Sequence, residues 1–224
     1  MDWPTIALEW SPGFRIISTR FPSIYLFDRV ADASDFDALY ELEAMTNSRL
    51  RNEIGEISLI PESERLYGNG SGPIMAAFTH LNPHGSRFSD GSYGVFYAAK
   101  EKETAIAETK HHSAIFMQAT NEEPIYLQMR LYQMRVQGLV NDLSEAKDTH
   151  PELFSLHNYA SSQSMGKEIR DSGANGICYP SVRRENGTCV AAFKTALLRD
   201  CYHAAYLEYH WDGKAINYVT ERIE

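Results

Sequence analysis

PIYLQMRLYQMRV (124–136) alternates apolar and polar side chains over most of its length. An alternation with a period of two is typical of a β-strand that turns one face toward a core. GLVNDL (138–143) continues the apolar pattern after a bend. We therefore expect a long strand in this part of the chain.

Other segments with strand character flank this run on both sides. Downstream, four short β-runs are separated by turn residues: ANGICYPSV (174–182), GTCVAAFK (187–194), CYHAAYLEYHW (201–211) and KAINYV (214–219). Upstream, PSIYLFDRV (22–30) and YGVFYAAK (93–100) are rich in residues that favour strands.

Helices are predicted where apolar residues recur at helical spacing. The segments are ASDFDALYELEAMTNSRLR (33–51), EKETAIAETKHHSAIFM (101–117) and HNYASSQSMGKEIRDSG (157–173). Gly173 would close the last of them in the left-handed conformation that glycine adopts freely. GPIMAAFTHL (72–81) fits a short helix or a strand. Because helices and strands mix without a regular β-α-β rhythm, we predict an α+β fold with mostly antiparallel strands.

Composition limits the class of protein. The 224 residues are 43% hydrophobic and contain no Pro/Gly/Ser-rich linker, which predicts a single domain over 1–224. The net charge of -9 repels phosphate backbones, so direct nucleic-acid binding is not expected. Cys178, Cys189 and Cys201 form no Cys-x-x-Cys pair and are typical of reduced thiols in a cytoplasmic protein. No apolar run reaches the ~18 residues of a membrane-spanning helix.

Three motifs favour ordinary structural roles. GNGSG (68–72) lacks the flanking residues of a nucleotide-binding loop. His80 and His84 are separated by Pro83, which opposes a shared helix face, so we expect no metal site. Ser181 is not surrounded by the G-x-S-x-G of a serine hydrolase, and its neighbours alone indicate a turn serine.

An anion site is predicted in GSRFSDGS (85–92), where Arg87 stands beside Phe88 among glycines and serines. The planar guanidinium group matches the geometry of a phosphate, and small neighbours let backbone N–H groups approach the same anion. Tyr97 follows on the next strand, where its ring could stack on a base or on nicotinamide.

The helix at 101–117 places Glu108 and His112 one turn apart. The expected core stripe of this helix is Ile106, Thr109, Ser113, Phe116 and Met117, and Glu108 lies beside it. A carboxylate at the edge of a core is costly unless it has a partner or a function. From the residues alone, a surface salt bridge and a functional site remain equal alternatives for Glu108.

GSRF (85–88), Tyr97, AIAE (105–108) and GANGICYPSVR (173–183) together resemble the RES domain. This family is named for an arginine, a glutamate and a serine and occurs in bacterial toxin–antitoxin pairs. The matching residues here are Arg87, Glu108 and Ser181, and Tyr97 matches a tyrosine that usually lies between the arginine and the glutamate. The resemblance covers about 22–200, and TNSRLRNEIG (46–55) resembles the longer versions of the domain, with an extended N-terminal part of about 1–70.

The resemblance implies an ADP-ribosyltransferase-like fold, in which two mostly antiparallel sheets form a NAD cleft flanked by helices. It implies that NAD is the substrate, that the nicotinamide–ribose bond is cleaved with water or phosphate as acceptor, and that no metal takes part. Some members instead attach ADP-ribose to a protein. A cognate helix-turn-helix antitoxin that blocks the active site is the implied partner.

The resemblance also implies roles for the matching residues. Glu108 would stabilise the positive charge that develops on the ribose and hold its 2′-hydroxyl. Arg87 would bind the pyrophosphate or an attacking phosphate.

Four side chains would complete the NAD site. Tyr97 would pack against nicotinamide or its ribose, and Phe88 is expected to contact the cofactor. Ser181 would donate a hydrogen bond to the carboxamide or the ribose, and His112 would orient the catalytic carboxylate or contact the substrate.

Because NAD is anionic and the protein acidic, a locally positive cleft is required, and the arginines available for it are Arg49, Arg51, Arg183 and Arg184.

Two other functions stay open at this point. One is a mono-ADP-ribosyltransferase that modifies a cytosolic protein, and the other is a non-catalytic module that binds a nucleotide or a partner.

Overall fold

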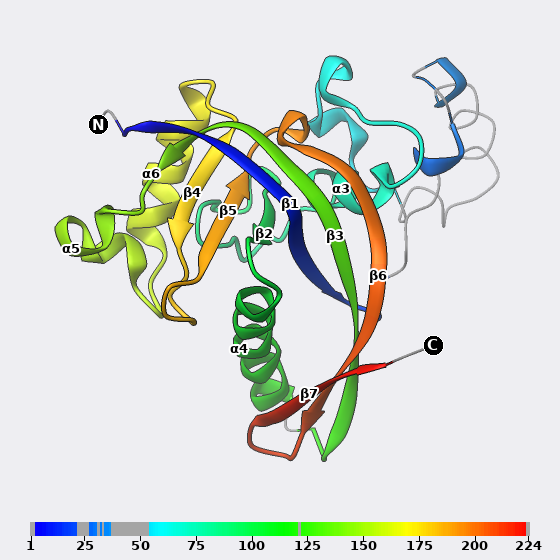
Figure 1. The fold of residues 1–224 in the computed structure, drawn as a ribbon, viewed down its shortest axis with the longest axis vertical. Helices are drawn as coiled ribbons and strands as arrows, with labels where there is room; N and C mark the ends of the chain where they lie inside the picture. Colours follow the sequence, from blue (N-terminus) through cyan, green and yellow to red (C-terminus); the bar gives the residue numbers. More distant parts are fainter. Residues whose placement is uncertain are drawn as a thin grey trace.

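The structure is a computed structural model, which describes residues 3–21, 27–30, 32, 34–36, 54–120 and 122–222. Seven strands of the described residues join in one sheet of order β1-β2-β5-β4-β3-β6-β7 (Figure 1). The strands are β1 (Thr5–Ser18), β2 (Phe96–Ala99), β3 (Ile125–Asp142), β4 (Gly176–Pro180), β5 (Thr188–Ala192), β6 (Leu198–Trp211) and β7 (Ile216–Arg222). The α-helices of the described residues are α3 (Ser71–Thr79), α4 (Lys102–Thr120), α5 (Ala146–Thr149) and α6 (Ala160–Asp171).

Five of the strands form a closed circuit of hydrogen-bonded pairs. β1 pairs antiparallel with β3 along most of its length and also meets β2 at Phe14↔Ala99. β5 lies between β2 and β4, and β4 returns to the end of β3 in a short parallel pairing at Asn141↔Ile177. The long strands β1, β3 and β6 curve around α4, which places this helix next to the sheet that carries the site (Figure 1).

β3 buries both of its faces, each in a different core. Met129 and Leu131, on the odd face, belong to a cluster with Trp211, whereas Met134 and Val136, on the even face, belong to a second cluster. Alternation along 124–136 correctly predicts the strand. It does not reveal that the buried side chains of the odd face lie mainly in the first half of the strand and those of the even face mainly in the second half.

The α+β class and the mostly antiparallel pairing are confirmed, as are the long strand and the four runs after it, although the third of these runs is part of a long strand, β6. The two predicted sheets are parts of one continuous sheet, because β1 and β3 are long enough to bond to both. α4 and α6 are the helices predicted at 101–117 and 157–173, and α3 shows that the segment 72–81 is helical up to Thr79. Gly173 has φ 90° directly after α6, as predicted.

Other predictions are wrong or lie outside the described residues. Phe27–Arg29 is a 3₁₀-helix where the end of a strand was predicted, and 22–26 is outside the described part. Of the helix predicted at 33–51, only 34–36 is described, and it is helical. Phe116, predicted to face the core, is 46% exposed, because α4 packs on the sheet mainly through Ala105 and Met117.

α3 begins where the backbone turns sharply. Gly70 has φ 80° immediately before the helix, and the carboxylate of Asp28 accepts hydrogen bonds from Gly72 N (2.8 Å) and Ser71 Oγ (3.2 Å). GNGSG (68–72) is thus the start of a helix capped by an aspartate. In the part of the chain that the structure describes, no helix is long and apolar enough to cross a membrane.

Candidate functional site

A cavity of about 390 Å³ lies between β1, β2 and α4. Its lining includes four of the six predicted site residues, namely Arg87, Tyr97, Glu108 and His112. The other two, Phe88 and Ser181, are buried behind this lining, with exposed fractions of 0% and 4%. We call this space the catalytic cavity below, after the role that we propose for it in the next subsection. Its volume is in the range of ligand-binding pockets.

The loop that carries Arg87 is tied to β2 through the hydroxyl of Tyr97. This oxygen accepts a hydrogen bond from Phe88 N (3.0 Å) and shares another with Ser86 Oγ (2.8 Å). The ring of Phe88 packs edge-on against Tyr179, with ring centroids 4.9 Å apart. Phe88 therefore anchors the loop, while the ring of Tyr97 lines the cavity.

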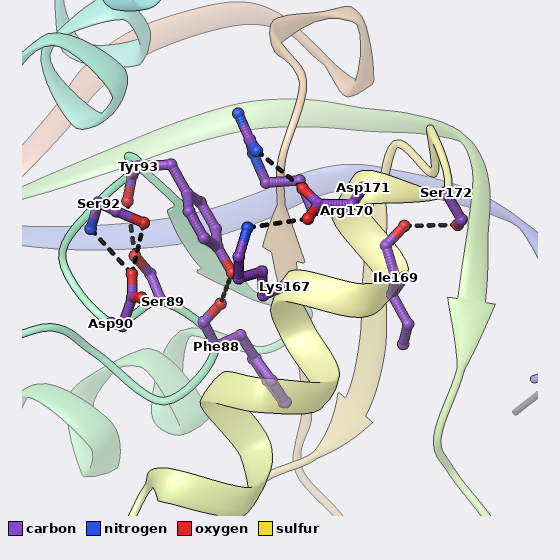
Figure 2. Close-up of polar contacts among 10 residues, drawn as sticks. All are labelled: Phe88, Ser89, Asp90, Ser92, Tyr93, Lys167, Ile169, Arg170, Asp171 and Ser172. Atoms are coloured by element: carbon purple, nitrogen blue, oxygen red, sulfur yellow. Dashed lines mark hydrogen bonds and ion pairs between the residues drawn. The ribbon is translucent and has the colours of Figure 1, made fainter.

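The other side of the loop is fastened to α6 (Figure 2). Tyr93 Oη donates to Phe88 O (2.5 Å), and Ser89 Oγ donates to Tyr93 O (2.6 Å). The guanidinium of Arg170 covers the ring of Tyr93 at 4.4 Å and also pairs with Asp171, as seen in Figure 2. These contacts fix the backbone on both sides of Arg87.

The guanidinium of Arg87 is held at one nitrogen. Nη1 donates to Leu153 O (3.1 Å) and Ser155 O (3.2 Å), and the group lies 4.7 Å from the ring centre of Tyr159. Within the described residues, Arg87 has no carboxylate partner, and its Nε and Nη2 donate no hydrogen bond. A largely buried cation with free donors beside a cavity is suited to bind an anion.

Glu108 is oriented by Ser181 from behind. Ser181 Oγ donates to Glu108 Oε1 at 2.6 Å and accepts hydrogen bonds from Arg183 N and Arg184 N, both at 3.1 Å. One donor and two acceptor positions are all that a hydroxyl has. The hydroxyl of Ser181 therefore has no hydrogen-bonding position left for a further partner in this structure. Glu108 forms no ion pair within the described residues, so the salt-bridge alternative finds no support there.

His112 lies at the rim of the cavity, one helical turn from Glu108. Part of its side chain is exposed, yet the protein around the ring excludes enough water to lower its pKa. Nearby Glu108 raises the pKa, whereas Arg183 and Arg87 lower it further. The lowered pKa favours the neutral imidazole, which is a polar group in the lining of the cavity.

Arg15, on β1, is a cavity residue that the sequence interpretation missed. Its Nη1 donates to Tyr97 O (2.9 Å), and its guanidinium lies 4.3 Å from the ring centre of Phe96. The Nε atom is buried and has no partner within the described residues. Burial lowers the pKa of this arginine to about 10. A cation held without a carboxylate partner favours an anionic ligand.

The signal for this strand is present in the sequence. Ile6, Leu8 and Trp10 alternate, but Ser-Pro-Gly (11–13) follows and is typical of a turn. The structure accommodates that tripeptide as a register shift within β1, between Trp10 and Gly13, after which the strand continues.

The arginines proposed for a positive cleft lie elsewhere or outside the described residues. Arg183 donates to Leu156 O (3.0 Å), and Arg184 donates to Thr104 Oγ1 (3.1 Å) on α4, so both connect the loop after β4 to neighbouring segments. Arg49 and Arg51 fall outside the described part of the chain. Among the described residues, Arg15 and Arg87 supply the positive charge of the cavity lining.

The family comparison agrees with the motif. The family model described as RES domain matches residues 64–212. The uncharacterized protein y4oC of Sinorhizobium fredii (strain NBRC 101917 / NGR234) is 29% identical over 206 residues, which are 91% of this chain and 84% of that protein. A chain in the crystal structure of the M. tuberculosis MbcT–MbcA toxin–antitoxin complex has a TM-score of 0.47 and 13% identity, over 88% of this chain and 86% of that one.

Proposed function

Because the chain belongs to the RES domain family, we propose that it consumes NAD by cleaving the nicotinamide–ribose bond and that it is the toxin of a toxin–antitoxin pair. One observation carries this proposal. The catalytic cavity combines an oriented carboxylate, Glu108, with two arginines, Arg15 and Arg87, that have no carboxylate partner within the described residues. This combination suits a substrate that is anionic at its pyrophosphate and develops positive charge at its ribose.

Each group has a distinct task in the proposed reaction. Arg15 and Arg87 bind the pyrophosphate through their free donors. As the bond between ribose C1′ and the pyridinium nitrogen breaks, its electron pair passes to that nitrogen, and nicotinamide leaves neutral without needing a general acid. The Glu108 carboxylate stabilises the oxocarbenium-like ribose. The oxygen of water or phosphate then bonds to C1′, and an attacking water releases its proton to the solvent.

Product analysis tests the proposed function. Purified protein free of any antitoxin is incubated with NAD that carries an isotope in its adenosine half. We expect free nicotinamide together with labelled ADP-ribose or its phosphate ester. Label retained on a protein band in a lysate would instead indicate ADP-ribosyl transfer. NAD that stays intact, or binds without turnover in calorimetry, would contradict cleavage.

The proposed partner is a cognate antitoxin with a helix-turn-helix domain that covers the catalytic cavity. Expression of the chain alone should then arrest bacterial growth and lower cellular NAD, and co-expression of the antitoxin should restore both. The proposed site of action is the cytoplasm, where NAD is available and the three free cysteines, which are buried, stay reduced. Growth arrest at normal NAD levels would count against this role.

Ser181→Ala should lower kcat about 10- to 100-fold with little change in KM, because a hydrogen bond to a charged group is lost. Steady-state kinetics of nicotinamide release would measure both. Ser181→Thr keeps a hydroxyl and should recover part of kcat. Since Ser181 Oγ also accepts two backbone hydrogen bonds, thermal unfolding must be compared in parallel. A rise in KM at unchanged kcat would mean that Ser181 contacts the substrate directly.

A further inference from the structure

A second hollow of about 540 Å³ adjoins the catalytic cavity. The two spaces share a wall, to which Arg15, Ser86 and Tyr97 contribute. Glu108 lines the catalytic cavity and is not part of the lining of the hollow. A ligand that reacts at Glu108 and is longer than the catalytic cavity can therefore extend past Arg15 into the hollow.

The walls of this hollow are mainly apolar. α3 contributes Pro73, Ala76 and Ala77, which lie on one helix face at i, i+3 and i+4. The opposite face of α3 carries Met75 and Phe78, which pack in the core. Small side chains on this half-buried face leave the hollow open, and Tyr93 and Tyr132 line it as well.

The chemistry of NAD orients the molecule in these two spaces. Its scissile bond must lie at Glu108, so the nicotinamide riboside end occupies the catalytic cavity. Its pyrophosphate fits Arg15, which lines both spaces. The end that remains is adenine, an uncharged aromatic ring, and apolar walls with aromatic side chains suit such a ring.

A third groove also reaches Arg15, but its lining differs. It has a volume of about 470 Å³ and runs between β1 and α4, past Arg20, His112 and Ser113. Arg20 lies 4.3 Å from the ring centre of Phe116 and carries a positive charge at its outer end. The hollow beside α3 also contains a second arginine, Arg130, whose Nη2 donates to Phe21 O. Apolar side chains make up a larger share of its lining than of the third groove, so the hollow suits an uncharged base better.

We propose that the hollow beside α3 binds the adenine end of NAD and makes the enzyme selective for dinucleotides over nicotinamide mononucleotide. This inference rests on the proposed function for the identity of the substrate. The shape of the hollow is a property of the fold, so binding of an adenine nucleotide can be tested without any cleavage.

Ala77→Leu fills part of the hollow and is the test variant. We expect AMP to bind the unaltered protein in calorimetry and to bind Ala77→Leu at least about tenfold more weakly, since added methylene groups compete with the base for space. The ratio of kcat/KM for NAD to kcat/KM for the mononucleotide should fall by a similar factor. Ala77→Ser keeps the volume and should bind AMP as the unaltered protein does. Ser113→Leu narrows the third groove instead and should also leave AMP binding unchanged.

The outcomes separate the two proposals. Equal AMP affinity in Ala77→Leu and the unaltered protein would overturn the adenine site, and so would a loss confined to Ser113→Leu. A failure to cleave NAD, with AMP binding still sensitive to Ala77→Leu, would refute the proposed function and leave the adenine site standing. Ala76→Leu fills the same hollow from the same helix face and takes the place of Ala77→Leu if the latter shows a broadened thermal transition.

Discussion

Replacing Glu108 with glutamine is expected to lower kcat for nicotinamide release about 100- to 1,000-fold, with little change in NAD affinity. The amide has nearly the same shape as the carboxylate, and its oxygen can still accept the hydrogen bond from Ser181. What it lacks is the negative charge that opposes the positive charge on the ribose in the transition state. Initial rates measure kcat, and calorimetry with NAD measures the affinity.

Glu103→Gln is the matched control, because Glu103 lies in the first turn of the same helix and is exposed. It removes the same charge and should leave kcat unchanged. If Glu108→Gln kept the rate of the unaltered protein, the carboxylate would have no part in the reaction. If both variants lost activity equally, the effect would come from the net charge of α4.

The part of the site that lies close together in the sequence could be predicted from local patterns. Tyr97 and Glu108 follow Arg87 within one loop, one strand and the first turns of one helix. Strand alternation and helical spacing then suffice to place these side chains near one another. The structure places all three in the lining of one cavity, and His112 joins them because it is one turn further along α4.

Ser181 shows why the rest needed the fold. Its neighbours indicate a turn serine, and it does accept hydrogen bonds from two backbone N–H groups of its own turn. The same oxygen reaches Glu108, 73 residues earlier in the sequence, because the pairing of β4 with β5 and of β5 with β2 brings that turn beside α4. The structural role and the proposed functional role of Ser181 rest on the same hydroxyl, and sequence spacing alone could not connect them.

Arg15 could not be found for a related reason. Its strand is interrupted in the sequence by Pro12 and Gly13, and the register shift that absorbs them depends on the partner strand β3. Nothing local marks this arginine as a cavity residue, because its position follows from the pairing of β1 with both β2 and β3.

Arg15→Leu should have opposite effects on binding and on stability. We expect NAD to bind about 10- to 100-fold more weakly, because a charge-assisted hydrogen bond to the pyrophosphate is lost. The affinity should also depend less on salt, since one cation fewer faces the anion. In contrast, the ligand-free protein should unfold at a higher temperature, because burial disfavours the charged form of Arg15, as its lowered pKa of about 10 indicates.

The combination of both effects separates a binding residue from a structural one. Arg199→Leu makes the same change in net charge at an exposed arginine of β6, whose Nη1 donates to Thr195 O and Leu198 O. It should leave NAD affinity unchanged and should not raise the unfolding temperature. If Arg15→Leu lowered the unfolding temperature and left NAD affinity intact, Arg15 would serve to hold β1 to Tyr97 O rather than to bind an anion. The hydrogen bond to Tyr97 O and the contact with Phe96 supply no negative charge, so the proposed anionic ligand would account for the cost of burying this cation.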